Sequence, residues 1–173
     1  WPGGGDAAKH EAVTAFIRTG GDVGDSHAWR VGLSWLRVDA GERLSGSEDA
    51  PDAFRGRSRL AIADFVWKWA PHGNARERSF RFQTEYLRRE DDGMFTADLL
   101  GTPNADSYQA AHSGWYAQGV YQFRPGWRVG LRHEALNRGL VSAGTNAALF
   151  ATSGQTPART SAMLDYARSE RSR

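Results

Sequence analysis

The sequence predicts an all-β fold in which about seven antiparallel strands run up and down in one sheet. The first observation is compositional: the 173 residues include Gly 20, Phe 8, Trp 7 and Tyr 5, while only 40% are hydrophobic. Many aromatic residues and glycines with few aliphatic ones suit strands and turns better than a helical core. The second observation is that apolar and polar residues alternate with a period of two along most of the chain, which is typical of strands with two different faces.

The first half of the chain contains four such segments. A weak strand is predicted over Glu11–Arg18, followed by a stronger one that begins at Trp29. Its alternation changes phase after Trp35, which predicts a β-bulge near that residue. The next two strands, Ala61–Trp69 and Arg76–Tyr86, flank a tight turn and are therefore predicted to pair antiparallel.

The second half of the chain contains three further segments. Trp115–Phe123 and Trp127–Glu134 are separated by an Arg-Pro-Gly turn, which predicts a second antiparallel hairpin. A last alternating segment covers Thr160–Tyr166. The motif WRVGL occurs at 29–33 and again at 127–131, each time after a short turn, so hairpins recur about every fifty residues.

The connections between these strands are predicted to alternate in length. Four are expected to be short: Thr19–Ser26, Pro71–Asn74, Arg124–Gly126 and Ala167–Arg171. Three are expected to be long polar loops: Ala40–Gly56, Glu90–Ser113 and Asn137–Pro157. Regular alternation places all short turns at one end of the sheet, as in outer-membrane barrels with short periplasmic turns and long outer loops.

The positions of aromatic residues on the apolar faces also indicate a membrane barrel. Small or aliphatic residues occupy the middle of these faces, and aromatic residues lie near both ends, as at the two interfaces of a bilayer. The predicted belt residues are Trp29, Trp69, Phe123, Trp127 and Tyr166 beside the short turns, and Trp35, Tyr86 and Trp115 beside the long loops. A soluble sandwich, the alternative for such alternation, places its largest side chains in the middle of the core.

Composition excludes several other classes of protein. The chain has 22 basic and 20 acidic residues, so a net charge of +2 gives no strong attraction to nucleic acid. It has no cysteine, which excludes disulfides and thiolate metal sites. No signal peptide and no apolar run of helix-spanning length is present. Residues 1–173 are therefore predicted to be part of a single outer-membrane β-barrel domain, with no second domain, and a fragment of a longer protein.

Four segments carry a resemblance to known proteins: SHAWRVGLSWL (26–36), ADFVWKWAPHGNARERSF (63–80), SGWYAQGVYQFRPGWRVGLRHEAL (113–136) and ARTSAMLDYARSE (158–170). Together they resemble outer-membrane proteins of Gram-negative bacteria of the kind labelled zinc-regulated TonB-dependent receptor-like or porin-like. The resemblance implies an outer-membrane barrel for solute uptake, with the lipid bilayer and small solutes as partners. TonB would be a further partner if a plug domain exists elsewhere in the protein. The resemblance carries over no ligand residues.

The polar face of the predicted strands is expected to line the lumen of the barrel. Its predicted lumen-lining residues are Arg30, Asp64, Lys68, Arg81, Glu85, Gln118, Gln122, Arg128, Arg132, Glu134 and Asp165. They could form a solvated wall of cross-strand ion pairs, or an arginine-rich pore wall that favours anions. Two interpretations other than transport remain open at this point: a surface barrel whose long loops bind a partner, and a soluble all-β binding domain.

Sites of other chemistry are not predicted. The five histidines lack the spacing that places two imidazoles on one metal, and no nucleophile motif or phosphate-binding loop is present. Arginines and aromatic residues alternate between opposite faces, whereas a nucleic-acid stacking platform needs them on one face. The sequence therefore predicts no catalytic residue, no cofactor, no metal and no nucleic-acid partner.

Overall fold

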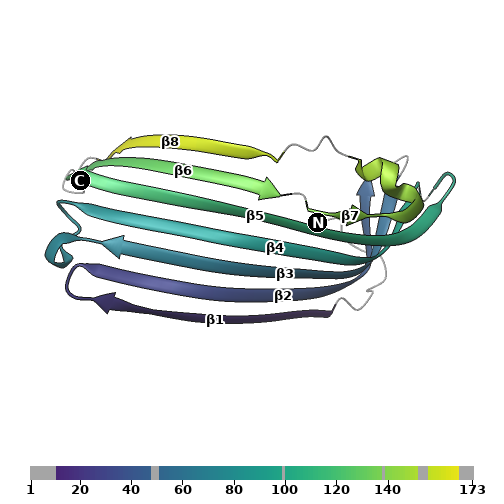
Figure 1. The fold of residues 1–173 in the computed structure, drawn as a ribbon, viewed down its shortest axis with the longest axis horizontal. Helices are drawn as coiled ribbons and strands as arrows, with labels where there is room; N and C mark the ends of the chain where they lie inside the picture. Colours follow the sequence, from purple (N-terminus) through teal and green to yellow (C-terminus); the bar gives the residue numbers. More distant parts are fainter. Residues whose placement is uncertain (1–10, 48–50, 99, 138, 152–155, 168–173) are drawn as a thin grey trace, which may run out of the picture.

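The computed structural model is one antiparallel sheet, confirming the predicted all-β class. It describes residues 11–47, 51–98, 100–137, 139–151 and 156–167. Successive long strands lie side by side in the order β1-β2-β3-β4-β5-β6-β8, and a very short β7 pairs with β5 (Figure 1). The long strands are therefore arranged up and down, as the alternating sequence segments predict.

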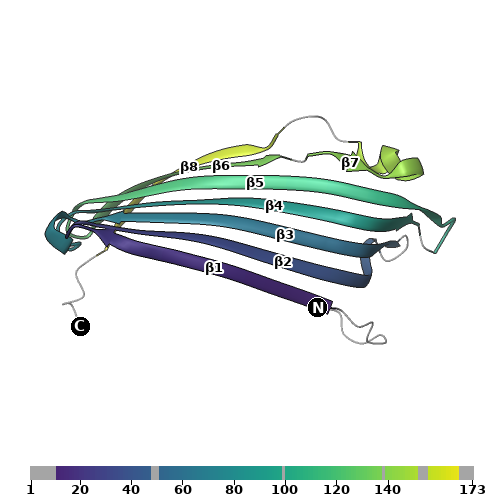
Figure 2. The same cartoon turned by 60° about the horizontal axis from the view of Figure 1, so that its bottom comes forward.

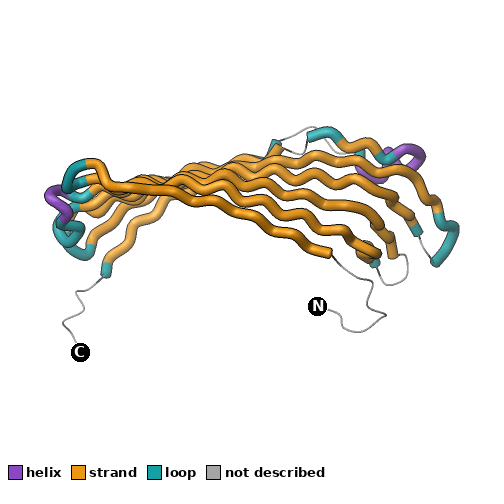
Figure 3. Tube along the Cα trace, turned by 90° about the horizontal axis from the view of Figure 1, so that it is seen from below, coloured by secondary structure: helices purple, strands orange, loops and turns teal. Residues whose placement is uncertain are grey.

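The strands are longer than their alternating segments indicate. Their bounds are β1 Glu11–Val23, β2 His27–Gly46, β3 Pro51–Trp69, β4 Ser79–Ala97, β5 Asn104–Arg124, β6 Trp127–Asn137, β7 Val141–Ser142 and β8 Ala158–Tyr166. Two short 3₁₀ helices lie at opposite ends of the sheet: η1 Pro71–Gly73 and η2 Gly144–Phe150 (Figure 3). In this view the sheet is arched rather than flat.

The two predicted hairpins are confirmed. In the β3–β4 pair, Ala61 lies opposite Arg88 and Trp69 opposite Phe80, although β4 begins at Ser79 rather than at Arg76. In the β5–β6 pair, Trp115 lies opposite Ala135. The Pro-Gly turn between β5 and β6 is tight because Gly126 adopts φ 77°, a conformation that glycine reaches without steric cost.

The prediction of three long loops is wrong for two of them. Ala40–Gly56 is mostly strand, because β2 continues to Gly46 and β3 begins at Pro51. Glu90–Ser113 is also mostly strand, in β4 and β5. The third, Asn137–Pro157, is a long connection between the paired strands β6 and β8, and the structure places β7 and η2 within it. The physical reason for the first two is that the backbone hydrogen bonds between strands continue past the apolar part of these strands. There, charged side chains occupy the face that is apolar elsewhere, so apolar and polar residues no longer alternate in the sequence.

The predicted contrast between short and long connections fails at the first two of these loops and holds for the connection between β6 and β8. The β3–β4 connection, residues 70–78, is longer than the β4–β5 connection, residues 98–103. The β1–β2 connection is shorter than predicted, because β1 continues to Val23 instead of ending at Arg18. The predicted turn at Ala167–Arg171 lies outside the described residues apart from Ala167.

The β-bulge is in a different place from the one predicted. Pairing runs without interruption through Trp35 on both sides of β2, and the register shifts between Ala40 and Arg43 instead. The phase change in the sequence has another cause. Leu36 and Val38 lie on the polar face, so that face is locally apolar and the strand keeps its register.

The described sheet is open, with β1 and β8 as its two edges. A packed cluster lies at the end of the strands away from the β5–β6 turn, where β7 and η2 are placed (Figure 2). There Phe54 and Phe95 are 3% and 8% exposed. The rings of Tyr108 and Phe150 complete the cluster, with the Phe95 and Phe150 centroids 5.0 Å apart. The connection after β6 is therefore anchored on β4 and β5.

Candidate functional site

The strand register separates the predicted residues onto two faces of the sheet. Directly opposed residues in an antiparallel pair point to the same side, so the register assigns a face to each strand residue. One face, here called the polar face, carries all eleven predicted lumen-lining residues: Arg30, Asp64, Lys68, Arg81, Glu85, Gln118, Gln122, Arg128, Arg132, Glu134 and Asp165. The structure brings them to one side, and their role in lining a lumen stays a prediction.

The opposite face, here called the apolar face, carries the predicted aromatic belts. The register places Trp29, Trp35, Trp69, Tyr86 and Trp115 on it. Trp127 lies opposite Tyr166, with their rings 4.7 Å apart, and Phe123 lies beside Trp127 in the bulge that ends β5.

Large side chains on the apolar face are exposed even on strands that are not sheet edges. Leu33 on β2, Trp115 on β5 and Leu131 on β6 are 56%, 42% and 59% exposed. On the polar face the carboxylate residues Asp64 and Asp91 are only 8% and 5% exposed. Burial at these positions is inverted relative to the usual rule that large apolar residues are buried and carboxylates face solvent, while Phe54, Val66 and Phe95 are buried on the polar face.

Toward the end of the strands away from the β5–β6 turn, the apolar face stops abruptly where charged residues replace apolar ones. On β2 it carries no Asp, Glu, Lys or Arg from His27 to Trp35, and then becomes charged at Arg37 and Asp39. Asp39 accepts hydrogen bonds from Arg37 at 3.0 Å and from Arg57 at 2.9 Å. The Arg57 guanidinium, helped by that of Arg37, lowers the pKa of Asp39 below its ordinary value, and desolvation opposes this shift.

Several aromatic residues near the turns were not assigned to a belt from the sequence. Trp67 is stacked on His27, with the ring centroids 5.7 Å apart and the planes at 6°. Its other neighbour is Phe80, at 5.6 Å. Phe65 and Phe82 form the next pair toward the middle of the sheet. These residues are grouped by the cross-strand register, that is, by which residues of neighbouring strands lie opposite one another. The sequence alone does not give this register.

On the polar face, oppositely charged side chains form cross-strand pairs. Arg30 lies 3.9 Å from Asp64, and Arg128 is paired with Asp165. A glycine provides the space for Asp64: a Cβ at Gly32 would collide with the Asp64 carboxylate and crowd Arg18. Gly32→Ala is therefore incompatible with the present position of Asp64.

A second polar cluster surrounds Tyr116. Gln83 donates to the Tyr116 hydroxyl at 2.6 Å, and the Arg132 guanidinium lies over the Tyr116 ring, 3.9 Å from its centroid. Arg132 also donates to Glu134 at 2.8 Å, and Arg159 pairs with the same carboxylate at 2.7 Å. These contacts link β4, β5, β6 and β8 across the polar face.

Hydrogen bonds fix η2 to β5. The side chain of Asn146, only 4% exposed, donates to the Asn104 carbonyl at 3.0 Å and accepts from the Asn104 amide at 2.9 Å. Asp106 accepts from the backbone N–H of Thr145 at 2.8 Å and from its hydroxyl at 3.0 Å. Since Phe150 contacts Phe95 and Tyr108, which lie on the polar face, η2 covers part of that face.

The attachment of η2 is expected to weaken in acid. The hydrogen bonds from Thr145 and Ser107 lower the pKa of Asp106 below its ordinary value of 3.8. A depressed folded-state pKa stabilises the attached state above the ordinary pKa, and this stabilisation is lost as the pH falls through the lowered value. Amide exchange of Thr145 should therefore accelerate below about pH 4, relative to an amide of β5 used as the reference. In the Asp106→Asn variant the acceleration should disappear; persistence of the same pH dependence would contradict this assignment.

Two further observations on the described residues concern membrane-spanning helices and metal-binding clusters. Within the described ranges, no helix has the length and hydropathy needed to cross a membrane. Nor do three or more His, Asp or Glu side chains gather anywhere in those ranges in a way that could hold a metal ion.

Comparison with known proteins identifies no family for this chain. No protein-family model matches it, and no solved structure matches it. A curated relative described as an uncharacterized protein of Aquifex aeolicus (strain VF5) is 28% identical over 134 residues, which are 77% of this chain. The aligned part is 27% of that relative, so the chain spans about a quarter of the relative's length.

Proposed function

We propose that this chain is part of the wall of an outer-membrane β-barrel of a Gram-negative bacterium and that the barrel passes small solutes. The apolar face contacts lipid, and the polar face lines a water-filled lumen. Whether the complete barrel is an open porin-like channel or the barrel of a receptor depends on a plug domain, and TonB is a partner in the second case alone.

The inverted burial of the two faces carries this proposal. Leu33, Trp115 and Leu131 are exposed on inner strands, and in the described part of the chain no second layer covers them. An apolar face that crosses seven strands is far larger than the few hundred Å² of contiguous apolar surface typical of a soluble monomer. Lipid is a solvent in which this face costs nothing to expose.

The dimensions of the apolar band fit a bilayer. On β3 the apolar face runs from Trp69 to Ala61 and becomes charged at Arg59. A tilted membrane strand needs about 9–11 residues to cross the hydrocarbon core, which matches such a stretch. The charged continuation of β2–β5 beyond it is then the part of the barrel wall that extends into water.

Closure of the barrel requires further strands. An edge strand in lipid has unsatisfied backbone groups, so β1 and β8 both need partners in a membrane. The relative from Aquifex aeolicus is long enough to contain strands beyond the aligned part. We therefore expect the full-length protein to supply the missing strands.

The function is tested by adding the full-length protein to planar lipid bilayers and recording ionic current. Stepwise increases in current are expected, because a closed barrel with this polar face encloses an aqueous path. Protease protection of β2–β6 in vesicles is the matched control for insertion. A protein that inserts without a plug domain, or after deletion of one, and conducts no ions would contradict solute passage and favour a surface barrel that binds a partner.

A further inference from the structure

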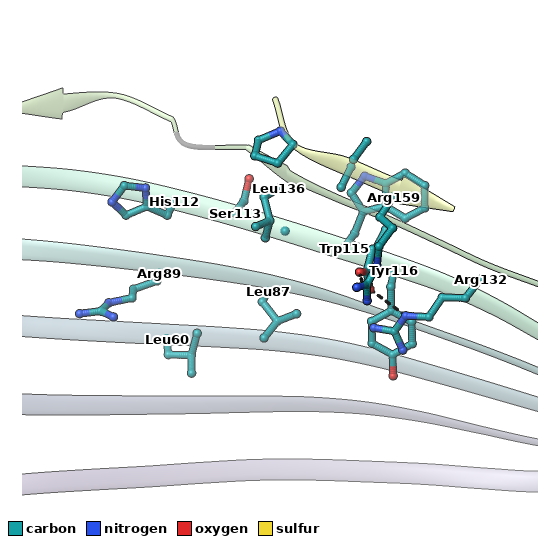
Figure 4. A pocket seen from close by; sticks show the side chains of 15 residues that line it. Leu60, Leu87, Arg89, His112, Ser113, Trp115, Tyr116, Arg132, Leu136 and Arg159 are labelled. Atoms are coloured by element: carbon teal, nitrogen blue, oxygen red, sulfur yellow. Dashed lines mark hydrogen bonds and ion pairs between the residues drawn. The ribbon is translucent and has the colours of Figure 1, made fainter. Parts of the chain in front are cut away.

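The polar face is interrupted by an apolar hollow. Leu60, Leu87 and Leu136 come from β3, β4 and β6 and line a depression of about 550 Å³ (Figure 4). In the register, Leu87 and Leu136 lie opposite Gly114 from its two sides. The leucines therefore gather beside a single glycine on β5, on a face that carries charged and amide side chains as well as apolar ones such as Val66 and Val120.

The absent side chain of Gly114 creates the space. A Cβ at this position would approach the Leu136 methyl group to 2.7 Å, closer than carbon atoms tolerate. Leu136 can therefore lie over β5, yet it remains 58% exposed. In a water-filled lumen these exposed methyl groups are an unfavourable surface that an apolar ligand would cover.

The rim of the hollow is basic. Arg89, Arg132 and Arg159 line it with one carboxylate, Glu134, and Arg89 is itself paired with Asp91 beyond the rim. Glu134 is shared by Arg132 and Arg159, so two guanidinium groups converge on one carboxylate. Their excess positive charge and remaining N–H donors favour a further anion at this edge of the leucine floor.

We propose that this hollow binds a small amphipathic anion, a carboxylate with an aromatic ring or short acyl chain. The apolar body lies on Leu60, Leu87 and Leu136, and the carboxylate accepts hydrogen bonds from Arg159 and Arg132. The volume is within the range of about 300–1,000 Å³ usual for small-molecule sites. As a step in solute passage this inference rests on the proposed function, because it assigns the solute class that the polar face selects.

Binding of 4-phenylbutyrate to the full-length protein in lipid nanodiscs, measured by calorimetry against empty discs, tests the proposal. Arg159→Gln and Leu87→Asn should each weaken binding about tenfold, since each removes a charge-assisted hydrogen bond or part of the apolar floor. Arg128→Gln is the matched control: Arg128 is also paired with a carboxylate on the polar face but lies outside the hollow. The control should bind as the wild type does.

Two further probes separate the contributions of charge and apolar surface. The cation 4-phenylbutylammonium and the short anion acetate should both bind much more weakly than 4-phenylbutyrate. Equal binding of the cation and the anion, or affinities unchanged by both hollow variants, would overturn the proposal. A protein that conducts ions but does not bind 4-phenylbutyrate would overturn this inference alone, whereas one that binds it without conducting would overturn solute passage alone.

Discussion

Replacing Ala117 with arginine is expected to destabilise the folded protein in a bilayer by about 2–4 kcal/mol. Ala117 lies on the apolar face of β5, between the aromatic residues Trp115 and Tyr121. A guanidinium at this height has no water to hydrate it and no opposing carboxylate, because Thr84 and His133 are its cross-strand neighbours. Urea titration of folding into lipid vesicles measures the change in the free energy of unfolding.

The matched control is arginine at Gln118, the adjacent residue of the same strand. Gln118 is on the polar face, opposite Gln83 and Arg132, and adjacent strand residues point to opposite sides. Gln118→Arg should therefore change stability by less than about 1 kcal/mol, and its effect should be a shift of ion selectivity toward anions. Equal penalties at both positions would contradict the assignment of the two faces.

Truncation of Phe95 to alanine is expected to cost about 3–5 kcal/mol, the usual range for a buried phenylalanine. Phe95 is 8% exposed and contacts the rings of Tyr108 and Phe150. The cavity left behind removes part of the apolar anchor of η2, which then depends on the contact of Phe150 with Tyr108 and on the hydrogen bonds of Asn146 and Asp106. Urea unfolding gives the loss of stability, and amide exchange in η2 shows whether the loss is centred there.

Met94→Ala provides the comparison for this variant. Met94 precedes Phe95 on the same strand but points to the opposite side and is 53% exposed. Its truncation should cost less than about 1 kcal/mol, because little surface is buried at that position. A similar loss in both variants would show that the aromatic cluster does not anchor the connection after β6.

The two-faced pattern could be predicted from the sequence because it depends on local alternation. Between Trp29 and Trp35, or between Trp127 and Arg132, odd and even residues differ in polarity, and this fixes the two faces. The hairpin turns were equally visible, since Pro125 and Gly126 combine the two residues that favour a tight turn.

The half of the sheet away from the β5–β6 turn could not be predicted in the same way. In Arg57–Arg59 and Glu90–Asp92 both faces carry polar residues, so alternation disappears although the backbone ladder continues. Long-range register was likewise hidden. It brings Leu60, Leu87 and Leu136 together around Gly114, although these residues are far apart in the chain. The hollow therefore emerges only when the strands are aligned.

The most direct test of lipid contact uses spin labels at Ala117 and Gln118 of the full-length protein in bilayers. Collisional relaxation by oxygen, which is concentrated in lipid, should dominate at Ala117. Relaxation by a water-soluble paramagnetic reagent should dominate at Gln118, because successive side chains of a strand face opposite sides of the sheet. Dominance of the water-soluble reagent at both positions would contradict the central claim that the apolar face of this sheet contacts a membrane.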